Sequence, residues 1–239
     1  MVALPNNWRD VSELTANNPL SSSAGDYLKA IWEAAGTGSA STNEIAARLS
    51  VASASVTSML VRLQERGLVE YERYRGASLT EAGHAEALRL VRRHRLIETF
   101  LTEHLGYSWE EVHEEAERLE HVVSDGFTDR LAEFLGHPGR DPHGAPIPAV
   151  DGTVKLDISH PLDAAEAGTQ VRIFQVNNRD VSVLAYLGKR GLVPGRLLAV
   201  KENRAVDGVV TVEDENGTPH SLGKLLTSSL LVQSTSESD

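Results

Sequence analysis

The sequence lacks cysteine altogether, and aromatic residues make up only 5% of its 239 residues. Without cysteine, neither disulfide bonds nor thiolate-ligated zinc sites are possible. No apolar run approaches the roughly 18 residues that would span a bilayer, and the N-terminus lacks the basic and apolar regions of a signal peptide. We therefore expect a cytoplasmic protein with no membrane partner. Its hydrophobic content of 41% allows one large core or two to three small ones.

Positive charge is also scarce, since 23 Lys and Arg face 34 Asp and Glu, for a net charge of -11. The distribution of this charge matters more than its sum. Residues 42–100 carry 9 Arg and 7 Glu, whereas residues 101–140 carry 3 Arg and 10 acidic residues. The acidity is therefore concentrated in the second segment, and the first segment is free to meet an anion such as DNA.

The stretch from His94 to Asp125 repeats histidine and carboxylate residues at helical spacing. Ser108 and Glu111 have the spacing of a capping box, which predicts a helix beginning there. At about 100° per residue, four polar residues of this helix share a quarter to a third of its circumference; they are His113, Glu117, Glu120 and His121. The preceding helix adds His94 and Glu98 one turn apart.

Spacing alone leaves two interpretations of this stretch open, a metal site or a solvated acidic face. If it is a metal site, oxygen donors with imidazole and no thiolate suit Mn or Fe(II), while Zn, Co and Ni compete by raw affinity.

The segment before this stretch has the pattern of a helix-turn-helix. A first helix from Ser22 or Ser23 ends at Gly36. A capping box at Ser41 and Glu44 then opens a short helix, and a third helix follows a brief break. The start of this third helix carries small hydroxyl residues that could approach DNA bases; they are Ser53, Ser55, Thr57 and Ser58. An ordinary helical hairpin is the competing interpretation.

A two-stranded hairpin is predicted next, turning at Arg75 and Gly76, and it favours a winged helix. Arg73 and Arg75 at its tip suit phosphate or minor-groove contacts. Thr80 is expected to cap a long helix over residues 81–105. The arginines of that helix, Arg92, Arg93 and Arg95, are expected on a solvated or salt-bridged face.

The remaining sequence predicts a linker and a β domain. A Pro- and Gly-rich segment without periodicity is followed by five short strand patterns, which suggest a small SH3-like barrel. The fold class expected is mainly α and multidomain. Its predicted parts are a flexible extension (1–20), a winged-helix DNA-binding domain (21–88), a helical dimerisation and metal domain (89–136), a linker (137–166) and an SH3-like, FeoA-like domain (167–234).

The order of these motifs resembles the diphtheria-toxin-repressor family of metal-dependent transcriptional regulators. The resemblance covers roughly residues 23–233 and is carried by the winged helix, HRLIE, VHEEAERLEHVVSD and DPHGAPIP. It implies two metal sites per chain. The regulatory site would use Asp26, Glu117, Glu120 and His121, and the ancillary site would use His94, Glu98, His113 and Asp180. Without the resemblance, Asp26 is simply a favourable carboxylate near a helix N-terminus.

Two positions bear on which metal the resemblance implies. Iron-responsive relatives have Met where this chain has Asp26 and Cys where it has Glu117, whereas manganese-responsive relatives have carboxylates at both positions. Hard oxygen donors also suit Mn chemically. Two-domain manganese regulators place Glu where this chain has Lys29, so we expect two separated sites and not a binuclear cluster.

The function expected is a manganese-dependent repressor of metal-uptake genes that binds operator DNA as a homodimer and is not an enzyme. An iron(II)-dependent regulator of the same family is the first alternative. A metallohydrolase is a second, but no recognisable nucleophile or phosphate loop accompanies the His and Glu residues.

Overall fold

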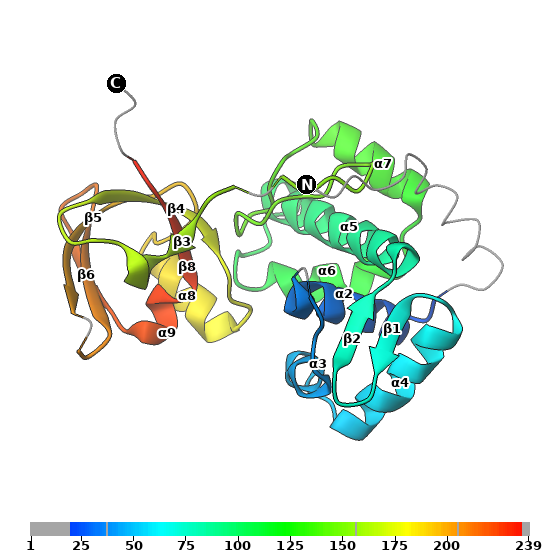
Figure 1. The fold of residues 1–239 in the computed structure, drawn as a ribbon. Coiled ribbons are helices and arrows are strands. Elements are labelled where there is room, and N and C mark those ends of the chain that lie inside the picture. Colours follow the sequence, from blue (N-terminus) through cyan, green and yellow to red (C-terminus); the bar gives the residue numbers. More distant parts are fainter. Residues whose placement is uncertain (1–19, 37, 156, 205, 236–239) are drawn as a thin grey trace. The chain divides into compact units, whose positions relative to one another are not determined.

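The computed structural model describes residues 20–36, 38–155, 157–204 and 206–235. The predicted N-terminal extension, apart from Leu20, lies outside these residues, as does the end of the C-terminal tail. The chain divides into two compact units. Unit 1 comprises the residues up to His94 together with Pro148–Val154, and unit 2 comprises Arg95–Ile147 and the residues from Lys155 onward. Figure 1 labels most of the helices and strands of both units.

Three helices form the helix-turn-helix of unit 1. Helix α2 (Ser22–Ala35) begins where the Ser21 hydroxyl accepts a hydrogen bond from the Ala24 N–H. Helix α3 (Thr42–Leu49) has the predicted capping box, and helix α4 (Ser53–Glu65) follows a short break. The apolar faces of the three helices meet in one core that includes Leu28, Ile45 and Leu60. The predicted helix-turn-helix is therefore confirmed.

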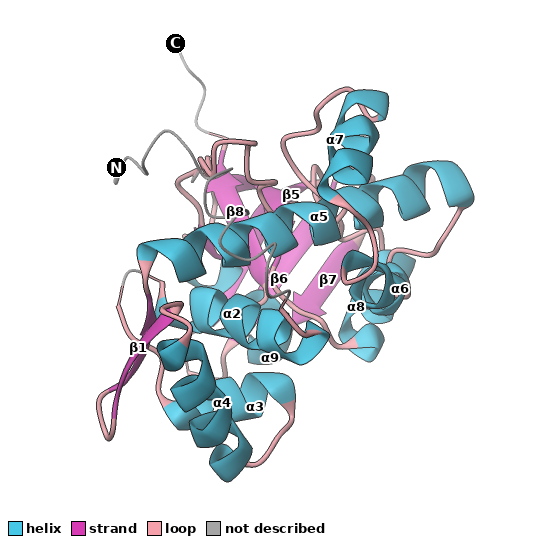
Figure 2. Cartoon of the chain, turned by 90° about the vertical axis from the view of Figure 1, so that its right-hand side faces the viewer, coloured by secondary structure: helices cyan, strands magenta, loops and turns pink. Residues whose placement is uncertain are grey.

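The predicted wing is an antiparallel hairpin of β1 (Val69–Glu72) and β2 (Gly76–Leu79). Figure 2 shows it as a separate two-stranded element. Gly76 has a φ of 97°, and a Cβ there would lie 2.5 Å from the carbonyl oxygen of Ala40. Glycine therefore allows β2 to approach residue 40, with which Ala77 exchanges two backbone hydrogen bonds of 2.8 Å. The wing is in this way tied to the segment between α2 and α3.

The long helix α5 (Glu81–Leu105) has the predicted bounds, and Thr80 accepts a hydrogen bond from the Gly83 N–H at its start. Of the two surroundings expected for its arginines, the salt-bridged one is confirmed at Arg95, whose Nε lies 3.5 Å from a carboxylate oxygen of Asp141. The solvated one is wrong for the other two. Arg92 and Arg93 are buried, at 8% and 6% exposed, and Arg92 donates to the Pro148 carbonyl at 2.8 Å. Arg92 therefore does not face solvent, because the Pro-rich segment contacts its guanidinium group.

The helical part of unit 2 contains α6 (Val112–Glu120) and α7 (Asp125–Phe134). The capping box predicted at Ser108 does not form. The Ser108 hydroxyl donates instead to the Glu111 carboxylate at 2.6 Å, and residues 109–111 make a turn. Helix α6 consequently starts at Val112. These helices share a core with the end of α5 that includes Leu96, Val112 and Leu131.

The β domain of unit 2 is a six-stranded antiparallel sheet in the order β3-β8-β4-β5-β6-β7. Bulges interrupt β4 near Ile173 and β5 near Val200, and they increase the local bend that curls a small sheet. The strands are β3 (His160–Pro161), β4 (Gln170–Val176), β5 (Leu197–Arg204), β6 (Val209–Asp214), β7 (Pro219–Leu222) and β8 (Leu230–Ser234). Five of these strands were predicted, including the hairpin of β6 and β7 around Asn216 and Gly217, and the prediction missed the two-residue strand β3.

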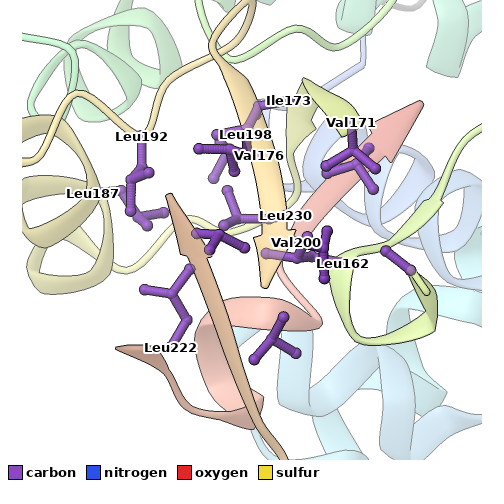
Figure 3. Close-up of a cluster of buried hydrophobic side chains, with 14 of the residues drawn as sticks. Leu162, Val171, Ile173, Val176, Leu187, Leu192, Leu198, Val200, Leu222 and Leu230 are labelled. Carbon is purple, nitrogen blue, oxygen red and sulfur yellow. The ribbon is translucent and has the colours of Figure 1, made fainter. Parts of the chain in front are cut away.

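Three helical segments accompany this sheet, namely η1 (Leu162–Ala164), α8 (Val181–Lys189) and α9 (Lys224–Thr227). The inward residues of the strands and of α8 form a dense apolar cluster (Figure 3), in which Ile173, Leu187 and Leu230 are fully buried. The alternation of buried and exposed residues along β6 and β7 matches a sheet with one face on this core. The SH3-like fold expected for this segment is confirmed.

Among the described helices, none is by itself long and apolar enough to cross a bilayer. Only α3 and α4 taken together meet that standard of length and composition, with a bend of 108° at their junction.

Candidate metal centre and DNA-binding surface

Within unit 2, His113 stands between two of the predicted carboxylate ligands. Its Nδ1 lies 3.0 Å from a carboxylate oxygen of Glu98 on α5, and its Nε2 lies 3.7 Å from a carboxylate oxygen of Glu117 on α6. Glu98 is 2% exposed, whereas Glu117 is partly exposed. Within unit 2, His113 therefore joins a residue expected in the ancillary site to one expected in the regulatory site.

The last turn of α6 carries the other two predicted regulatory ligands of unit 2. Glu120 is fully buried, and one of its oxygens lies 3.4 Å from Nε2 of His121, the residue that ends the helix. Burying a carboxylate is costly unless a charge or hydrogen bonds accompany it. A buried carboxylate beside an imidazole argues against the solvated acidic face that spacing had left open.

Two predicted ligands belong to unit 1. His94 is 6% exposed and precedes Glu98 by one turn on α5. Asp26 is the fifth residue of α2, so it lies beyond the first turn. The favourable effect of a helix N-terminus on a carboxylate is largely confined to that first turn. The Oδ1 atom of Asp26 is buried. The simple interpretation of Asp26 as a carboxylate of the first helical turn is therefore wrong.

Asp180 lies at the start of α8 in the β domain and caps that helix. Its Oδ1 accepts hydrogen bonds from the Ser182 hydroxyl, at 2.5 Å, and from the Ser182 N–H, at 2.8 Å. These donors hold the pKa of this exposed carboxyl below its usual range. The role of Asp180 in this structure is that of a helix cap, and its place in the ancillary site stays a prediction from the resemblance.

Sequence reasoning missed two buried polar residues next to Glu98. Asp141 and His143 come from the segment predicted as a linker, and ligand atoms of all three residues lie within 4.8 Å of one another. Burial raises the pKa of Asp141, and the charge of Glu98 adds to this effect, whereas Arg95 opposes it. The sequence feature that could have revealed them is an Asp and a His inside DPHG, together with arginines one turn apart on α5.

The donor set fits a hard or borderline divalent cation. Glu98, Glu117 and Glu120 supply oxygen atoms, and His113 and His121 supply imidazole nitrogens. Such donors suit Mn(II) and Fe(II), and they also bind Zn(II).

The N-terminal half of α4 presents a polar face. All four predicted DNA-binding residues of this helix are exposed, while Val56 and Leu60 face the core. The hydroxyls of Thr57 and Ser58 donate to backbone carbonyls one turn earlier, at 3.2 and 3.1 Å. A helix with small exposed side chains can approach the floor of a DNA major groove closely.

The tip of the wing carries the two predicted phosphate-contacting arginines. Arg75 is 77% exposed at its side chain and pairs with Glu72 at 3.1 Å, and Arg73 lies 5.1 Å from the ring centroid of Tyr74. Both charges lie on a short hairpin whose second strand is held, close to the turn, by the bridge between Ala40 and Ala77.

A helix-turn-helix with a wing, followed by helices bearing buried carboxylates and histidines, defines a class of protein, the winged-helix DNA-binding proteins with a candidate metal centre. Three family models match the chain. Residues 19–77 match the iron dependent repressor N-terminal DNA binding domain, residues 80–149 match the iron dependent repressor metal binding and dimerisation domain, and residues 160–234 match the FeoA domain.

Individual relatives support the same family. The iron-dependent repressor IdeR of Mycobacterium leprae is 31% identical over 197 residues, which cover 74% of this chain and 84% of that protein. The diphtheria toxin repressor of Corynebacterium diphtheriae is 36% identical over 159 residues, covering 63% of this chain and 70% of that protein. This chain belongs to the diphtheria-toxin-repressor family of metal-dependent transcriptional repressors.

Solved structures extend the similarity to the three-dimensional fold. A manganese-dependent transcriptional repressor in complex with manganese is 38% identical, with a TM-score of 0.83 over 88% of this chain and 99% of that one. The manganese regulator SloR is 33% identical, with a TM-score of 0.74 over 89% and 98%. The expected fold and family are thereby confirmed, and both iron- and manganese-dependent proteins are among the relatives.

Proposed function

We propose that this protein is a manganese-dependent repressor that binds operator DNA as a homodimer and controls metal-uptake genes. The observation that carries the proposal is the donor set at the regulatory positions, where Asp26 and Glu117 provide oxygen and no thiolate or thioether is present. Oxygen donors with one imidazole suit Mn(II) and reduce the affinity advantage of softer ions. The similarity to manganese-dependent repressors supports this choice, and Fe(II) is the second candidate.

The regulatory site would be completed by residues of both units. Asp26 belongs to the unit that carries α4 and the wing, whereas Glu117, Glu120 and His121 belong to unit 2. The carboxylates of these residues repel one another when they converge, and a bound divalent cation supplies the charge that offsets this repulsion. Convergence then selects one arrangement of the DNA-binding domain relative to the helical domain.

The ancillary site would use His94, Glu98 and His113, with Asp180 as the ligand from the β domain. The 3.0 Å contact of His113 with Glu98 supports this assignment, because it brings an imidazole nitrogen and a carboxylate oxygen together inside unit 2. Asp180 is supported by the resemblance alone. We propose that the protein holds two metal ions per chain.

A homodimer would present two copies of α4 to DNA. Recognition helices about 34 Å apart enter successive major grooves on one side of the duplex. Large apolar side chains exposed at the end of α5 and along α7 support such a dimer, because they lie in the segment that matches a dimerisation domain; they are Leu105, Phe127 and Phe134, at 57%, 47% and 63% exposed.

The expected size of the metal-dependent change follows from the linkage between metal binding and the conformational equilibrium. Metal at 100 times its dissociation constant stabilises the competent arrangement by about 2.7 kcal/mol, roughly a hundredfold change in population. This is sufficient for a repressor to respond to the metal level of the cell.

The metal preference is tested by Glu117→Cys. A thiolate at this position should shift metal-dependent DNA binding from Mn(II) toward softer ions. Electrophoretic mobility shifts with DNA from upstream of the protein's own coding sequence, in Mn(II), Fe(II), Zn(II) or EDTA, measure this directly. Unchanged metal dependence in the variant would remove Glu117 from the site. DNA binding that ignores EDTA in the wild type would refute the metal switch as a whole.

A further inference from the structure

Residues Asp141–Ala145 form a tight turn closed by a buried carboxylate, and we refer to them as the Asp141 turn. One oxygen of Asp141 accepts hydrogen bonds from the backbone N–H groups of His143 and Ala145, both at 2.9 Å. The N–H of Gly144 donates to the Asp141 carbonyl at 3.0 Å. Hydrogen bonds of this kind fix both the backbone and the carboxylate, so the turn is a rigid element within the predicted linker.

On one side, the Asp141 turn faces the metal-ligand surface of α5. The second oxygen of Asp141 lies 3.5 Å from Nε of Arg95, and Nη1 of the same guanidinium group donates to the Pro146 carbonyl. Glu98, one turn further along α5, has ligand atoms within 4.8 Å of those of Asp141 and His143. Because Glu98 also contacts His113, the turn packs directly behind a proposed metal ligand.

On the other side, the Asp141 turn is joined to strand β4 of the β domain. The His143 carbonyl accepts a hydrogen bond from the Val176 N–H at 2.8 Å. Gly144 has a φ of 85°, and a Cβ there would lie 2.2 Å from the Phe174 carbonyl oxygen. Next to the turn, the Arg140 guanidinium lies 3.7 Å from the ring centroid of Phe174. The strand therefore approaches the turn so closely that only glycine fits.

Trp109, in the segment between α5 and α6, adds a third connection. Its indole N–H donates to the Pro142 carbonyl at 3.0 Å, and its own carbonyl lies 2.9 Å from Nε2 of His143. The rings of Trp109 and His143 lie 5.0 Å apart. The indole also packs on the apolar cluster of the β domain, close to Gly188.

A third metal site at Glu98, Asp141 and His143 is not what these contacts favour. One oxygen of Asp141 accepts two backbone hydrogen bonds, and the other faces Arg95. Nε2 of His143 faces the Trp109 carbonyl, an acceptor, so this nitrogen acts as a hydrogen-bond donor there and not as a metal ligand. Both oxygens of Asp141 and Nε2 of His143 are thus engaged by protein groups, which favours a positioning role for the cluster.

We propose that the Asp141 turn couples docking of the β domain to metal affinity at Glu98 and His113, with Asp141 and His143 as positioning residues. This rests on the proposed function only in taking Glu98 and His113 as metal ligands. When β4 is in place, His143 and Gly144 hold Asp141 against Arg95, and Glu98 keeps its orientation toward His113. Coupling of this kind is reciprocal, so metal binding should also strengthen docking.

The test is Gly144→Ala in the full-length protein, because the added methyl group collides with the β4 backbone and changes no charge. Gly136→Ala is the matched control, since Gly136 has a similar positive φ of 69° but no atom within 4 Å of the added Cβ. We expect Gly144→Ala to accelerate hydrogen exchange in residues 170–177 and to weaken Mn(II) binding at one site about fivefold or more. The Mn(II) affinity is read from the electron paramagnetic resonance of the free ion. Gly136→Ala should change neither quantity.

Docking of the β domain could also affect metal affinity through Asp180, if Asp180 is itself a ligand. Repeating the measurement in the Asp180→Asn background separates this effect from that of the Asp141 turn. Asparagine caps a helix about as well as aspartate, so α8 is preserved. The effect of Gly144→Ala should persist in this background, and its disappearance would assign the coupling to Asp180 and overturn the role of the turn. Faster exchange in β4 with unchanged Mn(II) affinity would also overturn it.

His143→Phe is a milder variant that serves if Gly144→Ala does not fold. It keeps a ring against Trp109 and removes the Nε2 donor, and we expect weaker Mn(II) binding in the same direction. Wild-type affinity in this variant would refute the proposal. In the wild type, Mn(II) should slow exchange in residues 170–177 relative to EDTA, and equal rates would contradict reciprocity. Failure of the proposed function would look different, since wild-type protein would then not bind Mn(II) or would bind DNA equally with and without it.

Discussion

Helices α4 and α6 both carry polar side chains in helical register, yet their environments are opposite. The serines and threonine at the start of α4 are exposed, whereas Glu120 of α6 is fully buried and His113 contacts carboxylates on both sides. Small neutral hydroxyl groups are well solvated, so leaving them exposed until a partner binds costs little free energy. A buried carboxylate is stable only when a compensating group accompanies it. The comparison teaches that burial, more than residue type, separates a surface for a large partner from a site for a small ion.

The largest effect is expected from Glu120→Gln, which removes the buried charge and keeps the shape of the side chain. If Glu120 is a regulatory ligand, Mn(II) no longer favours the competent arrangement, and Mn-dependent affinity for the upstream DNA should fall up to about a hundredfold. Fluorescence anisotropy of labelled DNA at fixed Mn(II) measures the loss.

Glu115→Gln on the same helix is the matched control for this variant. Its side chain is 29% exposed and pairs with Arg118 at 3.1 Å, so the substitution removes a charge of the same kind from the surface. It should leave Mn-dependent DNA binding within about twofold, because exposed ion pairs contribute little. Equal losses in both variants would show that the comparison of buried and exposed charge is wrong.

An intermediate effect is expected at the wing from Arg73→Ala and Arg75→Ala. If these guanidiniums contact phosphates, each substitution should weaken binding to all DNA sequences alike and reduce the slope of log affinity against log salt by about 0.9. Titrations at several salt concentrations, with specific and random duplexes, give both numbers. A change in base preference with an unaltered slope would argue for base contacts instead.

The smallest effect concerns His84 of unit 1, which contrasts with His113 of unit 2. Nδ1 of His84 is buried and has no hydrogen-bond partner among the described residues, and burial lowers the pKa of this imidazole. The unfolded chain therefore binds the proton more readily, and stability falls as the pH drops below about 6.5 toward the folded pKa.

His84→Gln should reduce this acid sensitivity by a small amount. Urea unfolding in EDTA at pH 7.5 and 5.5 compares the two proteins, and the variant should lose less unfolding free energy between these pH values than the wild type. An identical loss would mean that the His84 imidazole is solvated and that its burial does not contribute to the acid sensitivity of unit 1.

Most of the architecture was predictable because its signals are local. The capping box at Ser41, the cap at Thr80 and the hairpin between two apolar runs depend on residues near one another in sequence, and all three are confirmed. The box at Ser108 failed although its spacing is the same, because its hydroxyl bonds the Glu111 side chain and the backbone turns before the helix starts. Local spacing indicates where a helix can start, and competing contacts decide where it does.

The candidate site was predictable in its residue types and only partly in its arrangement. Helical spacing placed Glu117, Glu120 and His121 near one another on one segment, and the structure adds the 3.0 Å contact between His113 and Glu98 across two helices. Asp141 and His143 escaped prediction because a Pro- and Gly-rich segment has no periodicity to indicate which side chains turn inward. Their burial depends on Arg95 and Trp109, which lie more than 30 residues away in sequence.

The sequence by itself determined the kinds of donor available, the helix-turn-helix with its wing, and the family, because these depend on residue identity and on spacing within one element. Only the tertiary structure decided which charges are buried and that the Pro-rich segment is a turn shared by α5 and β4. The reason is physical, since burial and the contacts of an irregular segment arise when distant parts of the chain pack together, and no local pattern encodes them.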